Sequence, residues 1–165
     1  MLPRARAWAR PRAMDERRET VATMVVEMFE SCLLAVHGPE PAAAEDWTRY
    51  VVDSNAAAVA GVLVVVDAGY PGPTAMQRAQ ANAAARQHGR YPPIAVVTGS
   101  AMHRGIVTVF SWMQKGNVVA YAPSRLSEAM MFAKIGTLSH GKALSRVHEL
   151  ARRVGSAWIQ RAVNF

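Results

Sequence analysis

GVLVVVD (residues 61–67) and PIAVVTG (residues 93–99) are two short apolar runs that decide the fold. An alanine-rich segment of helical periodicity lies between them. Runs of this length are typical of strands that are buried on both faces, and two parallel strands need a crossover of a dozen or more residues to connect them. The pattern therefore predicts a βαβ unit with two parallel strands at the centre of an α/β fold.

The residues before the first run predict a strand pair and a helix. Thr20 to Phe29 and Cys32 to His37 are rich in Val, Met, Leu and Phe, and only Glu30-Ser31 separates them, which is typical of a β-hairpin. A helix is expected over Ala42 to Val59, because helical spacing relates Trp47, Tyr50, Val51 and Ser54.

Three further helices and one strand are expected after residue 73. The helices are expected over Thr74 to Gln87, Ala101 to Gln114 and Arg125 to about Ile135, and the strand over Val118 to Tyr121. Thr74 has the side chain of a good N-cap. In the first of these helices Arg78 and Arg86 are expected in solvent, and the stripe that faces the sheet is expected to consist of Met76, Ala79, Ala83 and Ala84.

The whole order predicts an α/β fold with a mixed sheet. An N-terminal β-hairpin is followed by βα units with helices packed on the sheet, and a C-terminal helix is appended. We expect an α/β domain over residues 20–136 and an amphipathic helix within residues 137–165. Residues 1–19 are expected to form a disordered tail or to precede the true start at Met14, which a polar segment follows.

Composition narrows the classes of function. The net charge of +7 comes from the two ends of the chain, whereas the body from Met14 to Ser139 sums to −1, so no nucleic-acid partner is expected. No apolar segment is long enough to span a bilayer, and the N-terminus lacks the apolar stretch of a signal peptide. Cys32, the only cysteine, lies in an apolar stretch and is expected to be a buried core thiol. These features favour a cytoplasmic protein that does not bind membranes.

Ligands of open α/β sheets bind at the carboxyl ends of the strands. This rule predicts a ligand or anion site on one rim, formed by Asp67, Thr74, Thr98, Gly99 and Ser100. Simpler roles stay open, because Ser100 is also a good N-cap and an aspartate that ends a strand often accepts hydrogen bonds from its own loop. Thr74 and Ser100 are also candidate phosphorylation sites, since a helix N-terminus tolerates an added phosphate.

No cofactor, metal or catalytic set is expected. The glycine spacing of Gly69-Tyr-Pro-Gly72 does not fit a dinucleotide-binding loop, and the five histidines show no local metal-ligand spacing. Ser100, His103 and Asp67 lie near the same rim, which keeps a hydrolase-type enzyme as a third hypothesis. No Gly-x-Ser-x-Gly elbow surrounds the serine, however.

The C-terminal segment carries a regular apolar seam. A helix is expected over Gly141 to Ala162, with the seam residues separated by steps of three and four. Three alternatives stay open for this seam: packing against the chain's own domain, an interface with a protein partner or a second copy, and contact with an anionic membrane. The candidate interface residues are Leu144, Val147, Ala151, Val154 and Trp158.

Residues 20–136 resemble the STAS superfamily in its SpoIIAA-like branch. The resemblance lies in the order of the strand pair, a helix bearing Trp47-Thr-Arg-Tyr50, the central strand that ends in Asp67, the strand Ile94 to Thr98 ahead of a helix, and Tyr121-Ala-Pro-Ser124 before the last helix of the domain. It implies a small regulatory module that binds a partner protein. The phosphoserine switch of that branch has no counterpart here, since Asp67 continues into Ala-Gly-Tyr-Pro-Gly-Pro.

The leading hypothesis is therefore a non-enzymatic, STAS-like module that binds a protein partner, with the C-terminal helix as part of the contact or as the means of forming a homo-oligomer. The alternative is a sensor that binds a small molecule or an anion at the rim from Asp67 to Ser100.

Overall fold

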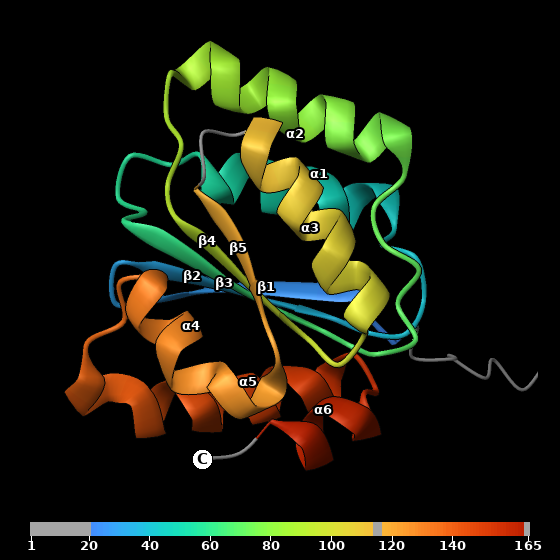
Figure 1. Ribbon diagram of the computed structural model, residues 1–165, viewed down its shortest axis with the longest axis vertical. Coiled ribbons are helices and arrows are strands. Elements are labelled where there is room, and N and C mark those ends of the chain that lie inside the picture. Colours follow the sequence, from blue (N-terminus) through green and yellow to red (C-terminus); the bar gives the residue numbers. More distant parts are fainter. Residues whose placement is uncertain (1–20, 114–116, 164–165) are drawn as a thin grey trace, which may run out of the picture.

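The computed structural model describes residues 21–113 and 117–163, so the expected tail over residues 1–19 lies outside the described residues. The chain forms one sheet with helices on both of its faces (Figure 1). The strands are β1 (Met24–Phe29), β2 (Cys32–His37), β3 (Gly61–Val66), β4 (Ile94–Thr98) and β5 (Val118–Tyr121). The helices are α1 (Ala44–Ser54), α2 (Ala75–His88), α3 (Ala101–Met113), α4 (Leu126–Phe132), α5 (His140–Arg153) and α6 (Ala157–Ala162).

The strands lie side by side in chain order, β1-β2-β3-β4-β5. β1 and β2 are antiparallel, and each later pair is parallel, which confirms the predicted α/β fold with a mixed sheet and an opening hairpin. The hairpin turn is tight, with Phe29 opposite Cys32 and Glu30 in the left-handed conformation at φ 53°. β3 lies at the centre of the sheet and is buried along its whole length.

Successive side chains of the central strands point to opposite faces of the sheet, so the core is divided into two clusters, one on each face. Leu63 and Val65 point to the face that α4, α5 and α6 cover, and Val62 and Val64 point to the face of α1. Figure 1 shows α1, α2 and α3 on one side of the sheet and α4, α5 and α6 on the other. Cys32 is 1% exposed and its pKa is raised to about 12 by burial, so the expected core thiol is confirmed.

The single helix expected over Gly141 to Ala162 is wrong. The chain forms α5 and α6 instead, because Gly155 adopts the left-handed conformation at φ 67° and ends the first helix. Ser156 then starts the second helix, where its Oγ accepts a hydrogen bond from the backbone N–H of Ile159 at 3.1 Å. This break turns α6 back toward the sheet.

The C-terminal seam packs against the chain's own sheet. Val147 and Ala151 are fully buried and Val154 is 3% exposed, while Leu144 and Trp158 are half-buried against the same core cluster. Of the three alternatives for the seam, the structure therefore shows intramolecular packing. A partner interface over these residues would have to displace the core of the domain.

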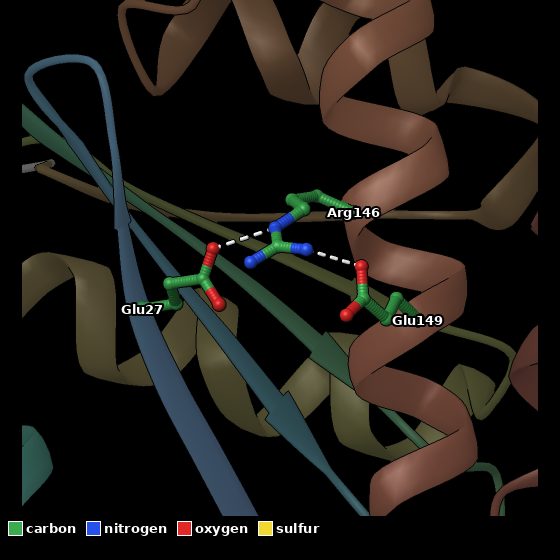
Figure 2. A network of polar contacts seen from close by, with 3 residues as sticks. All are labelled: Glu27, Arg146 and Glu149. Atoms are coloured by element: carbon green, nitrogen blue, oxygen red, sulfur yellow. Dashed lines mark hydrogen bonds and ion pairs between the residues drawn. The ribbon is translucent and has the colours of Figure 1, made fainter.

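A polar network holds α5 on the edge of the sheet. Arg146 Nε donates a hydrogen bond to Glu27 Oε1 of β1 at 2.6 Å, and its Nη1 donates to Glu149 of the same helix (Figure 2). All three side chains are partly exposed, so salt screens the network. It connects strand and helix positions that lie far apart in the sequence.

Helix α2 turns inward a face that shares only Ala84 with the one predicted. Ala84 packs against the core cluster, whereas Met76, Ala79 and Ala83 are exposed, and Ala85 is the residue that α2 buries. The cause is Gln77, because its backbone oxygen accepts the indole N–H of Trp47 at 3.1 Å and its side chain donates to the backbone oxygen of Ala42 at 3.1 Å. Helix α2 is thereby held on α1, with Arg78, Ala81 and Asn82 facing inward.

Candidate ligand-binding site

A cavity of about 220 Å³ lies over the sheet on the side of α1, α2 and α3, and its lining runs from the first residues of β4 and β5, Ile94 and Val118, to the carboxyl ends of β2, β3 and β4. Its floor includes His37, Val66 and Thr98, which are register partners across β2, β3 and β4 and are the last residues of these strands. Side chains of register partners share one face of a sheet, so these three point the same way. Most of the remaining lining is apolar.

The walls come from segments far apart in the sequence. Helix α2 contributes Arg78, Ala81 and Asn82 from its inner face, and the loop before it contributes residues 70–73. Helix α3 contributes His103 from its first turn. The two hydrogen bonds of Gln77 hold α2 against α1 and against Ala42, which precedes α1, and the inner face of α2 forms one wall of the cavity.

An aromatic cluster closes one end of the cavity. The rings of His37 and Tyr70 are stacked with their centroids 4.5 Å apart, and the ring centroids of Trp47 and Tyr50 are 5.3 Å apart. All four of these residues are less than a tenth exposed. Aromatic rings with a polar atom at one end are common in ligand pockets, since they combine an apolar body with a hydrogen-bonding group.

Three buried polar atoms of the cavity lack a hydrogen-bond partner within the described part of the chain. They are His37 Nδ1, Tyr70 Oη and His103 Nδ1. Native proteins pair most buried polar atoms, because each unpaired one costs about 1–3 kcal/mol. All three residues line the same cavity, which makes it the candidate ligand site of the described residues.

Burial fixes the protonation of two of these groups at neutral pH. It lowers the pKa of His37 to about 4, against a weaker opposing effect of the Asp46 carboxylate, so the imidazole is neutral. Burial also raises the pKa of Tyr70, so its hydroxyl keeps the proton and can donate it. A neutral imidazole has one donor and one acceptor nitrogen, and it can therefore bind either kind of partner.

Of the predicted rim residues, Thr98 is the one that lines the cavity. Both carboxylate oxygens of Asp67 accept hydrogen bonds from the chain itself. Oδ1 accepts one from the backbone N–H of Gly69 at 2.8 Å, and Oδ2 accepts one from the hydroxyl of Ser156. Gly99 packs against the ring of Trp158, where a Cβ at this position would lie 2.3 Å from Cζ2. The carboxylate and the glycine thus anchor α6 to the rim.

The other two predicted rim residues cap helices. Thr74 Oγ1 accepts the backbone N–H of Gln77 at 3.2 Å, and the side chain of Gln77 accepts the backbone N–H of Thr74, which completes a capping box. Ser100 Oγ accepts the backbone N–H of His103 at 3.2 Å. The contact of Ser100 with His103 is therefore that of a helix cap rather than of a nucleophile with its base.

Sequence reasoning missed His37, Tyr70 and Arg78 as site residues, and named His103 only as a partner of Ser100. One local signal was present, since His37 is a titratable residue that ends an apolar strand and directly precedes the Gly-Pro loop. Arg78 was expected in solvent, because the orientation of α2 depends on Trp47 and Ala42, which lie about 30 residues earlier in the chain.

Residues 21–113 and 117–163 contain no group of three or more His, Cys, Asp or Glu side chains arranged to hold a metal ion. Across the same residues, no helix combines the length and the apolar character that crossing a bilayer requires.

Comparison with known proteins gives no match to a family model, to a curated protein or to a solved structure, so the α/β fold and the cavity are what bear on the function of this chain.

Proposed function

We propose that the protein is a small-molecule-binding α/β module whose ligand occupies the cavity beside Tyr70, His103 and the inner face of α2. The observation that carries this proposal is that three residues with a buried, unpartnered polar atom line one largely apolar cavity. Ligand sites commonly have this composition, with an apolar lining and a few polar groups that orient the ligand. The end of the cavity beside His37, Val66 and Thr98 lies at the carboxyl ends of the strands, where ligands of open α/β sheets bind.

The volume of the cavity limits the size of the ligand. An apolar cavity of about 150 Å³ accommodates benzene. A cavity of about 220 Å³ therefore suits one ring with a small polar substituent, or an acyl chain of similar bulk, as the part of the ligand that it encloses. A nucleotide or a dinucleotide is far larger, which agrees with the absence of a phosphate-binding loop in the sequence.

The proposed role is sensing rather than catalysis. The side chain of Asp67 is engaged with Gly69 and Ser156, and Ser100 caps α3, so the hydrolase-type arrangement has no support from these contacts. A STAS-like module that binds a protein partner, suggested by the order of the elements, is the weaker candidate, because the C-terminal seam that was expected to supply part of the contact lies in the core.

Binding can be tested with a fragment library and two matched variants of α2. We expect one-ring compounds with a single polar group to raise the melting temperature and to shift amide resonances of β4 and α2. Ala81→Phe places a ring in the cavity wall and should abolish these effects. Ala83→Phe adds the same ring to the exposed side of the same helix and should preserve them. Equal binding by both variants, or no binding to the unmodified protein, would contradict the proposal.

A further inference from the structure

The charges around the cavity restrict the chemistry of the ligand. Among the described residues that line it there is no aspartate and no glutamate, and Arg78 is the residue of permanent positive charge. An ammonium ligand would therefore lose its hydration without gaining a counter-charge, which is costly in an apolar site. A neutral or an anionic ligand avoids this cost.

Arg78 is held at the wall of the cavity by its own loop. Its Nη1 donates a hydrogen bond to the backbone oxygen of Pro73 at 2.6 Å, and Pro73 itself lines the cavity. A guanidinium group carries five N–H donors in a planar fork, and the hydrogen bond to Pro73 uses one of them. That fork matches the two oxygens of a carboxylate.

The helices beside the cavity make a phosphate a poorer fit. One first-turn amide of α2 is taken by Thr74 and one of α3 is taken by Ser100, so each N-terminus already has an acceptor. A phosphate dianion would also need more charge than one arginine supplies, in a cavity whose lining is mainly apolar. A carboxylate carries a single charge and leaves the rest of the ligand apolar.

Resting on the proposed function, we infer that the ligand is a small carboxylic acid with an apolar body of about one ring, bound as its anion at Arg78. Tyr70 and His103 supply further hydrogen-bonding atoms within the same cavity. The apolar body lies on the floor formed by Val66, Val96 and their neighbours. Neutral His37 stacks with Tyr70 and adds no second charge.

The test compares acids with their neutral amides of the same shape. Benzoate, benzamide, phenylacetate and phenylacetamide are titrated into the full chain, and dissociation constants are measured by calorimetry or by amide resonance shifts. We expect each acid to bind at least about tenfold more tightly than its amide, which is the effect of one charge-assisted hydrogen bond. Added salt should weaken the acids more than the amides.

Three variants of α2 assign the effect to Arg78. Arg78→Gln should remove the preference for the acid and leave the affinity for the amide within about twofold. Arg78→Lys keeps the charge but loses the fork, and it should retain part of the preference. Arg86→Gln removes an exposed arginine of the same helix and should change nothing. Circular dichroism and the unchanged amide affinity show that each variant is folded.

The results test the inferred carboxylate and the proposed binding function separately. If acids and amides bind the unmodified protein equally, the inferred carboxylate is wrong while the binding cavity stands. The same holds if Arg78→Gln keeps the full preference for acids, since the anion would then bind elsewhere. If none of the four compounds binds and the fragment library also gives no ligand, the proposed function itself is overturned.

Discussion

Lowering the pH should destabilise the fold through His37. Burial lowers the pKa of its imidazole from 6.5 to about 4 in the folded protein. Between these two values the unfolded chain binds a proton at His37 and the folded chain does not. The free energy of unfolding therefore falls as the pH drops below 6.5, and the contribution of His37 levels off below about pH 4.

The size of the effect follows from the two pKa values. One pKa unit corresponds to about 1.4 kcal/mol, so the loss should reach about 2 kcal/mol at pH 5 and about 3 kcal/mol at pH 4. His37→Phe removes the titration and keeps an aromatic ring against Tyr70, where the His37 ring now stacks at a centroid distance of 4.5 Å. His88→Gln, on the exposed last turn of α2, is the control.

Urea unfolding at several pH values between 4 and 7.5 measures this contribution. The stability of the unmodified protein relative to His37→Phe should fall by about 2 kcal/mol between pH 7.5 and pH 5, whereas the comparison with His88→Gln should show no such trend. A difference between the protein and His37→Phe that stays constant over this range would refute the reasoning. The imidazole would then titrate alike in both states, which would contradict its burial as a neutral group.

Three further predictions concern the packing of the helices. Gly61→Ala should cost about 3 kcal/mol or more in urea unfolding, because its Cβ would lie 2.1 Å from the backbone oxygen of Ala133, which cannot move aside as a side chain could. An added Cβ at Gly105 of α3 would have nothing within 4 Å, so Gly105→Ala should instead raise the free energy of unfolding by up to about 1 kcal/mol. Equal effects of Gly61→Ala and Gly105→Ala would contradict the packing of α4 on β3. Ser156→Ala should lower the free energy of unfolding by about 1–3 kcal/mol, because it removes the cap of α6 and a hydrogen bond to buried Asp67. An unchanged melting temperature would mean that Ser156 does not anchor α6. Arg146→Gln should lower the melting temperature in low salt, with a smaller effect in high salt, and a drop that salt does not change would contradict the network of Figure 2.

The cavity shows where sequence patterns fail. Helix α2 has almost no apolar periodicity, since alanines occur on several of its sides, and its sequence therefore does not select an inner face. Two hydrogen bonds of Gln77 select it instead. That orientation carries Arg78 and Asn82 to the cavity and leaves Met76 82% exposed.

The break between α5 and α6 has a similar origin. The seam spacing continues through Gly155 as if the helix did, because apolar steps of three and four are a local pattern. The turn at Gly155 is favoured by contacts that the pattern does not contain, namely Ser156 with Asp67 and Trp158 with Gly99. Both contacts join α6 to strand ends that precede it by more than 50 residues.

By itself, the sequence determined the order of strands and helices from β1 to α4, the hairpin, the mixed sheet and the helix caps at Thr74 and Ser100. These features depend on periodicity and on residues within about four positions of each other, which a reading of the chain contains. Only the tertiary structure decided which face α2 presents, and that His37, Tyr70 and His103 meet in one cavity. The reason is physical, since these groups come from the end of β2, the loop after β3 and the first turn of α3, and their meeting depends on packing between elements rather than on any local preference.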